Sequence, residues 1–243
     1  MKLIRELRLS SVFPKHCAYC DRLIPGDKYV CDACRKSLPR IEGEICNSCG
    51  LEKKACACKG RKNYYSGIAA PFYYKGNVRK GLHIFKFRNS PSGSKVYARE
   101  IAETVRKRFP EISFDFVTAV PMTAKSLKDR GYDQNVLIAR ETAELLSLPF
   151  RPDVLKKIYE TEKQHGLPAY RRKGNLAGVF DVTDYREVEN KVILLCDDIS
   201  TSGETLNECA KMLWLAGAKK VYCAALALTE PKTGKGYDKN ARS

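Results

Sequence analysis

The sequence predicts an α/β protein with a doubly wound, mostly parallel sheet and a small zinc-binding module in front of it. Eight of the 11 cysteines fall between Cys17 and Cys58. Beyond them, short apolar stretches alternate with amphipathic ones, as strands and helices do in a parallel sheet. A chain of 243 residues can bury one good core and still carry an appendage. We expect the cysteine-rich module at 12–62, the α/β domain at 63–231 and a disordered tail at 232–243.

The cysteines come as three C-x-x-C pairs and one C-x-C pair. Two such pairs bring four thiolates onto one ion, the tetrahedral set that Zn²⁺ prefers. Four pairs therefore predict two zinc ions, both structural because four thiolates leave no position for water. The simplest assignment groups Cys17, Cys20, Cys31 and Cys34 at one site and Cys46, Cys49, Cys56 and Cys58 at the other. Interleaved pairing stays open, as does a redox or disulfide cluster without metal.

The stretch at 68–74 is apolar throughout and predicts a strand. Apolar residues then recur at helical spacing, which predicts one helix that begins after Asn77 and another that ends near Pro110. A loop rich in serine and glycine separates these helices at 89–94.

The second half of the chain continues the alternation of strands and helices. We expect a buried strand at 114–120, a helix at 134–147, a polar connection at 181–190, a strand at 191–196, a helix at 204–216 and a strand at 221–228. Gly217 marks the end of the last helix, because glycine readily adopts the left-handed conformation that ends helices. Ligands of such sheets bind beyond the carboxyl ends of the strands.

The formal charge of +16 is concentrated in the first 110 residues. Residues 63–110 hold ten Lys or Arg and only two Asp or Glu. Thiolates on zinc would offset the excess of the cysteine-rich module, but they leave the stretch 75–108 strongly basic. That stretch predicts either a surface for a polyanion such as single-stranded DNA or a solvated helix face. It has no regular series of aromatic residues, so any contact with nucleic acid would be electrostatic.

Residues 1–13 are too often interrupted by charge to form the apolar core of a signal peptide, and no later stretch is long and apolar enough for a membrane span. The sequence therefore predicts a cytoplasmic protein in a reducing compartment. Paired cysteines in that setting favour metal over disulfides.

The residues that carry chemistry lie at 192–205, where an apolar strand leads to Asp197 and Asp198 and then into a loop before a helix. Helix N-terminal N–H groups and loop hydroxyls predict a cradle for one phosphate. Its residues are Ser200, Thr201, Ser202, Gly203 and Thr205. The two acids could bind the vicinal hydroxyls of a sugar, which together predicts a ribose 5-phosphate site. An N-capped turn is the purely structural alternative, but two carboxylates at a strand end are costly without a partner.

This segment resembles the phosphoribosyl pyrophosphate motif of type I phosphoribosyltransferases, with Ser200 and Cys196 as small departures. Residues 120–135, which contain R-G-Y-D-Q-N, resemble the pyrophosphate loop and following helix of ComF-type competence proteins. Residues 163–180 resemble the flexible loop of the same family. With the double zinc ribbon in front and Lys86-Phe87 in between, the resemblance spans about 12–230.

The resemblance implies the type I phosphoribosyltransferase fold and the binding of phosphoribosyl pyrophosphate with Mg²⁺. In that family a nitrogen nucleophile attacks the anomeric carbon and pyrophosphate leaves. Asp197 and Asp198 would then bind the ribose hydroxyls. Arg171, beside Arg172, would reach the leaving group from a closing loop, unless both merely keep that loop soluble. Backbone and side chains that would face the pyrophosphate are Pro121, Met122, Thr123, Lys125 and Arg130.

Nothing in the sequence identifies the acceptor, so three hypotheses stand. The chain is a transferase with an unidentified nitrogen acceptor and, by resemblance, a role in DNA uptake. Alternatively, it is a non-catalytic factor that binds single-stranded DNA or a competence helicase and uses phosphoribosyl pyrophosphate as a regulatory or structural ligand. The third hypothesis is a zinc-stabilised adaptor with a decayed pocket, against which the intact acids and phosphate loop argue.

Overall fold

The computed structural model describes residues 15–25, 28–58, 62–87, 93–158 and 178–231. Most of the loop predicted at 89–94, most of the flexible loop with Arg171 and Arg172, and the tail predicted at 232–243 lie outside these residues.

A five-stranded sheet forms the centre of the molecule, and every strand pair within it is parallel. Its strands are β3 (Gly67–Ala69), β4 (Phe72–Tyr73), β5 (Phe116–Ala119), β8 (Val192–Ser200) and β9 (Lys220–Leu228). The spatial order is β3-β9-β8-β5, with β4 paired to β9 further along the same edge. The mostly parallel sheet predicted from the alternation of elements is confirmed.

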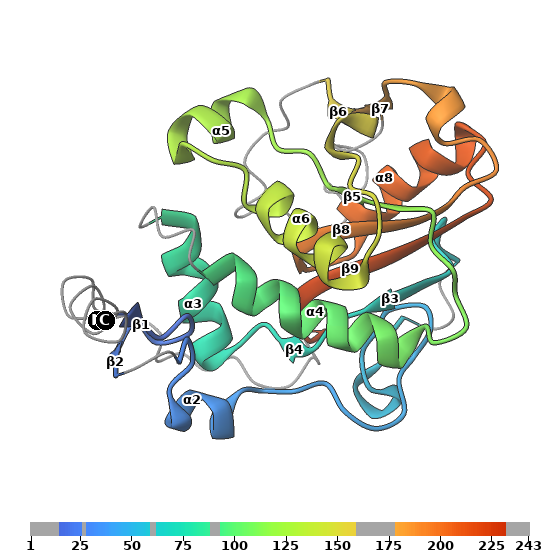
Figure 1. The fold of residues 1–243 in the computed structure, drawn as a ribbon. Coiled ribbons are helices and arrows are strands. Elements are labelled where there is room, and N and C mark those ends of the chain that lie inside the picture. Colours follow the sequence, from blue (N-terminus) through green and yellow to red (C-terminus); the bar gives the residue numbers. More distant parts are fainter. Residues whose placement is uncertain (1–14, 26–27, 59–61, 88–92, 159–177, 232–243) are drawn as a thin grey trace.

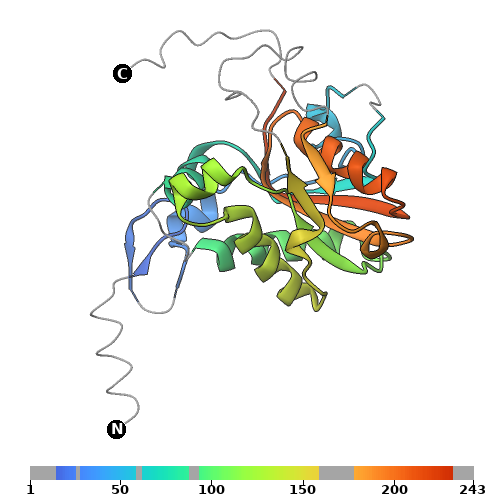
Figure 2. The ribbon, with the colours of Figure 1, turned by 90° about the horizontal axis from the view of Figure 1, so that it is seen from above.

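Helices cover both faces of this sheet (Figures 1 and 2). On one face lie α3 (Gly76–Phe87), α4 (Ser94–Arg108) and α6 (Gln134–Leu146), and their apolar residues join one buried cluster with Leu194 of β8. On the other face lies α8 (Glu204–Leu215), whose Leu206 and Leu213 join a second cluster with Ile193 and Leu195. The doubly wound arrangement is therefore confirmed.

Several elements of the structure differ from the prediction. The strand expected at 68–74 is split into β3 and β4, with Pro71, which has no N–H for a ladder, between them. The polar connection expected at 181–190 overlaps β7 (Phe180–Val182), which pairs antiparallel with β6 (Leu155–Lys157), and contains a short 3₁₀ turn. Both strands have three residues, too few to show an alternating pattern. The helix α5 (Ala124–Arg130) was not predicted, because it has no buried residue and hence no apolar stripe.

The strand that leads to the acids is longer than expected. The prediction ended it at residue 196, but β8 continues to Ser200 and keeps its pairing with β9 through Ser200 and Leu228. Asp197 and Asp198 are therefore fixed within the sheet rather than carried on a loop beyond it.

The first cysteine pairs lie in a small unit of β1 (Lys15–His16), β2 (Leu23–Ile24) and α2 (Asp32–Ser37) that packs against α3 and α4. Tyr19 is fully buried, with its ring centroid 5.9 Å from that of Phe72 and 5.5 Å from that of Tyr97. The Tyr97 hydroxyl donates a hydrogen bond of 2.6 Å to the Ala18 carbonyl. A Cβ on Gly81 of α3 would lie 2.5 Å from that same carbonyl oxygen, so only glycine permits this approach.

The later cysteine pairs contact a different part of the α/β region. The Arg108 guanidinium donates to the Asn47 side chain at 2.7 Å, and a Cβ on Gly50 would meet Ile68 and Leu228. Figures 1 and 2 show the two cysteine segments, dark blue and lighter blue, at separate places along the sheet. Within the described ranges, no helix has both the length and the apolar character that crossing a membrane requires.

Candidate functional site

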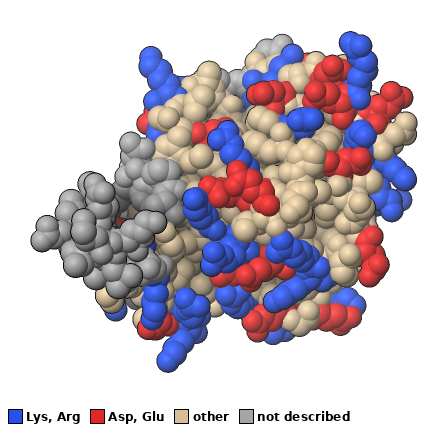
Figure 3. All heavy atoms as spheres, in the orientation of Figure 1, with Lys and Arg blue, Asp and Glu red and all other residues tan. Residues whose placement is uncertain are grey.

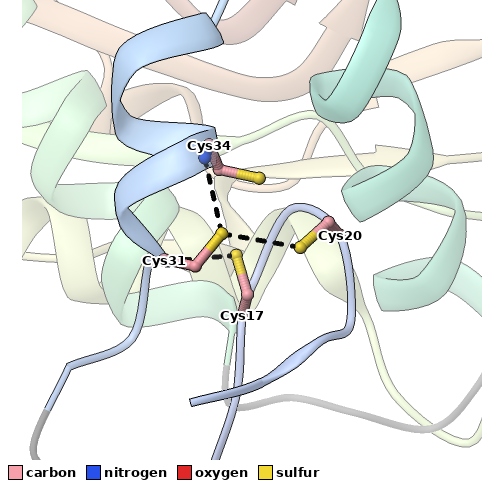
Figure 4. Close-up of side chains that lie close together, drawn as sticks. All are labelled: Cys17, Cys20, Cys31 and Cys34. Carbon is pink, nitrogen blue, oxygen red and sulfur yellow. Dashed lines mark hydrogen bonds between the residues drawn. The ribbon is translucent and has the colours of Figure 1, made fainter. Parts of the chain in front are cut away.

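Four sulfur atoms converge in the first cysteine cluster (Figure 4). The ligand atoms of Cys17, Cys20, Cys31 and Cys34 all lie within 4.8 Å of one another. The Cys31 N–H donates to Cys17 Sγ and the Cys34 N–H to Cys31 Sγ, each at 3.4 Å. The second of these bonds is the main reason why the pKa of Cys31 falls to about 7, which favours the thiolate that binds metal.

The second cluster contains the remaining four paired cysteines. Cys46 Sγ lies 3.6 Å from Cys58 Sγ, and Cys49 Sγ lies 3.5 Å from Cys56 Sγ. The simplest grouping predicted from the sequence is thus confirmed, and the interleaved alternative is not what the fold adopts. Two sets of four sulfur donors are consistent with two structural Zn²⁺ sites.

The acid pair lies at the carboxyl end of β8 and is almost completely buried. Asp197 is 7% and Asp198 5% exposed. Asp197 Oδ1 accepts a bond of 2.8 Å from the Asp198 N–H and one of 3.0 Å from Asn135 Nδ2. Asp198 Oδ2 lies 2.5 Å from Lys86 Nζ at the end of α3. Neither Asn135 nor Lys86 was assigned a role from the sequence, although both occur in segments that carry the family resemblance.

Burial changes the protonation of Asp197. Burial first, and then the charge of Asp198, raises the pKa of Asp197 to about 8. Asp198 has the Lys86 ammonium as its partner. Near neutral pH Asp197 therefore favours its protonated form, which could donate to a sugar hydroxyl as well as accept from one.

The predicted phosphate loop follows directly. Ser200 is buried at the end of β8, Thr201 and Ser202 are exposed, and Gly203 precedes α8 with a φ of 77° that only glycine adopts without strain. Ser200–Gly203 line a cavity of about 360 Å³. Asp197, Asp198 and Thr205 are not among the residues that line it. The N–H groups at the start of α8 make this loop suited to an anion.

The predicted pyrophosphate loop lies beside the acids, because β5 and β8 are neighbours in the sheet. The Val120 N–H donates to the Cys196 carbonyl at 2.9 Å, and Asn135 Nδ2 donates to the Val120 carbonyl at 3.0 Å as well as to Asp197. Asn135 therefore joins the end of β5 to the acid pair. Pro121, Met122 and Thr123 follow at once and are partly buried.

The two predicted cations of this region lie on α5. Lys125 is exposed near its start, after the N-cap residue Thr123, and Arg130 stands at its end. The Arg130 guanidinium donates to Gln134 Oε1 at 2.8 Å. Gln134 is fully buried, yet its Nε2 has no hydrogen-bond partner among the described residues. A buried donor without a partner is costly, which suits a region that receives a polar ligand.

Replacement of Lys86 by methionine should lower the free energy of unfolding by about 3–5 kcal/mol, because it leaves the Asp198 carboxylate buried without its counter-charge. Urea unfolding at pH 7 measures this loss. Asp198→Asn in the same chain should recover much of it, and Lys80→Met, on the same helix, should change little. Equal midpoints for Lys86→Met and Lys80→Met would show that the ion pair does not stabilise the fold.

Comparison with known proteins matches two family models to this chain. A double zinc ribbon domain matches residues 8–67, and a phosphoribosyl transferase domain matches residues 134–242. Competence protein F of Haemophilus influenzae is 25% identical over 229 residues, which cover 90% of this chain and 99% of that protein. Competence protein ComFC of Bacillus subtilis is 27% identical over 201 residues, 79% of this chain and 80% of the relative. The DNA utilization protein YhgH of Salmonella typhimurium is 24% identical over 208 residues, 82% and 90% of the two chains.

Proposed function

We propose that this chain, which is similar to competence proteins and matches a double zinc ribbon and a phosphoribosyl transferase domain, is a ComF-type protein that binds magnesium phosphoribosyl pyrophosphate and serves in DNA uptake. The names of its relatives, which refer to competence and DNA utilisation, support the second part. The binding proposal rests on one observation, the meeting of the acid pair and the phosphate loop at the carboxyl end of β8.

In this proposal each group at the edge of the sheet has one role. The N–H groups and hydroxyls of Ser200–Gly203 hold the 5-phosphate, with Thr205 in the first turn of α8 behind them. Asp197 and Asp198 hold the ribose hydroxyls. The pyrophosphate lies toward Pro121–Thr123, with Lys125, Arg130 and, from the loop beyond the described residues, Arg171. The Mg²⁺ that accompanies the substrate neutralises charge on the pyrophosphate oxygens.

These roles support a transfer reaction in which the protein positions reactants and manages charge. The anomeric carbon becomes oxocarbenium-like as pyrophosphate leaves, so a fixed ribose and nearby cations are the main aids. Lys86 must yield part of its contact with Asp198 when a ribose hydroxyl binds there. The nitrogen acceptor is to be found by measuring pyrophosphate release with a panel of nucleobases and amines.

Thermal unfolding with magnesium phosphoribosyl pyrophosphate tests the binding proposal. At a ligand concentration 100-fold above Kd, the free energy of unfolding should rise by about 2.7 kcal/mol, which corresponds to roughly 5–10 °C for a domain of this size. Magnesium should be withheld from the control by preparation rather than by a chelator, which would also attack zinc. An unchanged midpoint at millimolar ligand would contradict the proposal.

A second candidate function, non-catalytic binding of single-stranded DNA or of a helicase partner, is supported by the charge of α3. Its residues 76–87 contain no acidic residue, and Arg79 and Lys80 are exposed, whereas Lys86 is paired with Asp198. Arg79, Lys80, His83 and the 62% exposed Phe87 border an open hollow of about 620 Å³. Figure 3 shows Lys and Arg together with acidic residues on the face that α4 crosses, so α3 is the more uniformly basic helix.

Single-strand affinity should therefore fall when Arg79 and Lys80 are both replaced by alanine. If each contacts one phosphate, the slope of log K against log salt should become shallower by about 1–2. Fluorescence anisotropy with a labelled oligonucleotide between 50 and 200 mM salt measures both effects, with Lys219→Ala/Lys220→Ala as the control. An affinity that changes neither with salt concentration nor with these substitutions would exclude this surface as the DNA-binding site.

A further inference from the structure

The cavity at the phosphate loop is also lined by residues of the second cysteine cluster, which the sequence did not predict. Besides Ser200–Gly203, it is lined by Cys49 and Cys58, two of the four sulfur donors of the second cluster, and by Leu51 and Ala57 close to them. Tyr65, Leu228 and Thr229 line the cavity as well. The second cysteine cluster thus forms part of the space next to the loop that would hold phosphate.

Hydrogen bonds join this cluster to the segment that carries the phosphate loop. The Tyr65 hydroxyl donates at 3.0 Å to the carbonyl of Ser48, which lies in the turn between Cys46 and Cys49. The same hydroxyl faces the loop, since a Cβ on Gly203 would lie 3.5 Å from it.

A second chain of bonds runs in parallel. Asn63 Nδ2 donates to the Ser48 carbonyl at 2.7 Å and to its hydroxyl at 3.1 Å. The Tyr64 N–H donates at 2.8 Å to the Asn207 side chain, in the first turns of α8 directly after the loop. Residues 63–65 therefore connect the turn between Cys46 and Cys49 to the phosphate loop and the start of α8, so a shift of this turn would be transmitted to the loop.

The first cluster has no such connection among the described residues. Cys17, Cys31 and Cys34 belong to the buried cluster on the face of α3, α4 and α6, and none of them lines the cavity. Leu51 and Tyr65 belong to the cluster on the opposite face, with Leu206 of α8. The two cysteine clusters can therefore be compared within one molecule.

We propose that the second cysteine cluster, loaded with Zn²⁺, is a wall of the ligand site and holds the phosphate loop ready for a ribose 5-phosphate group, with Tyr65 as the positioning residue between them. This inference rests on the proposed function. It goes further because it links zinc binding at one of the two cysteine clusters to ligand binding at the phosphate loop. Coupling is reciprocal, so a ligand on the loop must also protect that metal site.

Cysteine labelling tests the coupling on the intact, zinc-loaded chain. The protein is treated with N-ethylmaleimide, with and without magnesium phosphoribosyl pyrophosphate, and labelled peptides are quantified by mass spectrometry. Ligand should slow labelling of Cys46, Cys49, Cys56 and Cys58 by about 5-fold or more, the lower range of typical couplings. Labelling of Cys17, Cys20, Cys31 and Cys34 should keep its rate. Zinc release into a metallochromic indicator should likewise slow for one of the two ions.

Tyr65→Phe removes the hydroxyl and keeps the ring. It should leave two zinc ions per chain, weaken ligand binding by about 2- to 10-fold, as the loss of one hydrogen bond allows, and reduce the protection of the second cluster. Tyr64→Phe is the matched control, because the ring of Tyr64 is half exposed against Trp214 and its N–H is unchanged.

Calorimetry on the same samples separates the outcomes. Binding with no change in the labelling of either cluster, or with equal protection of both, overturns the coupling and leaves the proposed function intact. Absence of binding overturns both. Binding with selective protection that Tyr65→Phe diminishes supports the inference.

Discussion

Cys34→Ser should cost the chain one zinc ion and most of its stability. Cys34 is buried in the core cluster that also contains Tyr19, Phe72 and Tyr97. Burial raises the pKa of its thiol, so this thiolate depends on a metal's charge. Structural zinc contributes about 10–16 kcal/mol of binding energy in small zinc domains, comparable to the whole stability of an ordinary domain, about 5–15 kcal/mol. Serine is a poor ligand for Zn²⁺, so the first unit should open and expose the aromatic residues beneath it.

Elemental analysis and urea unfolding followed by circular dichroism measure this effect. Cys223→Ala is the matched control, because Cys223 is equally buried but belongs to neither cluster. That control should keep two zinc ions and lose only the few kcal/mol of a small cavity, about 1–2. A Cys34→Ser protein with two zinc ions and the midpoint of Cys223→Ala would contradict a structural zinc site there.

Asp197→Asn with Asp198→Asn should abolish ligand binding while leaving the chain folded. The two carboxyl groups are the only proposed partners of the ribose hydroxyls. Loss of one hydrogen bond to a charged group, about 1.5–3 kcal/mol, and of one to a neutral carboxyl, about 0.5–1.5 kcal/mol, lowers affinity by about one and a half to three orders of magnitude. Calorimetry with magnesium phosphoribosyl pyrophosphate measures it. Thr183→Ala, whose hydroxyl bonds the Asp153 carbonyl away from the site, serves as the control. Unchanged affinity in the double variant would show that Asp197 and Asp198 do not bind the ligand.

The single variant Asp197→Asn should change how the stability of the folded chain depends on pH. The folded-state pKa of Asp197 is raised to about 8, so its favourable contribution is fully present below the unfolded pKa near 3.8 and is lost as pH rises through about 8. Wild-type protein should therefore lose stability over this range relative to Asp197→Asn. Urea unfolding at pH 5, 7 and 9 checks the sign. An Asn variant that is less stable at every pH by the same amount would contradict it.

The strand, turn and helix at 192–205 could be predicted because their signals are local. An apolar run, two acids and a hydroxyl-rich turn stand next to one another in the sequence, and the structure keeps that order in β8, its loop and α8. The cysteine clusters could be predicted equally well, since the spacing of the cysteines alone indicates which sulfur atoms can converge on one ion.

The partners of the acids could not be predicted in the same way. Lys86 meets Asp198 only because α3 packs across the sheet, and no spacing in the sequence carries that information. Asn135 lies on α6 and reaches β8 for the same reason. Likewise, the approach of Cys49 and Cys58 to the phosphate loop follows from tertiary packing around Tyr65, Ile68 and Leu228. Patterns along the chain identify the groups that do chemistry, while packing decides which neighbours hold them.

A crystal structure of the protein soaked with magnesium phosphoribosyl pyrophosphate addresses the site most directly. Electron density for the 5-phosphate should lie within hydrogen-bond distance of the Ser200–Gly203 N–H groups, with the ribose hydroxyls on Asp197 and Asp198. Density for the ligand elsewhere on the molecule, or a saturated soak in which Lys86 still occupies Asp198 and the loop holds nothing, would contradict the assignment.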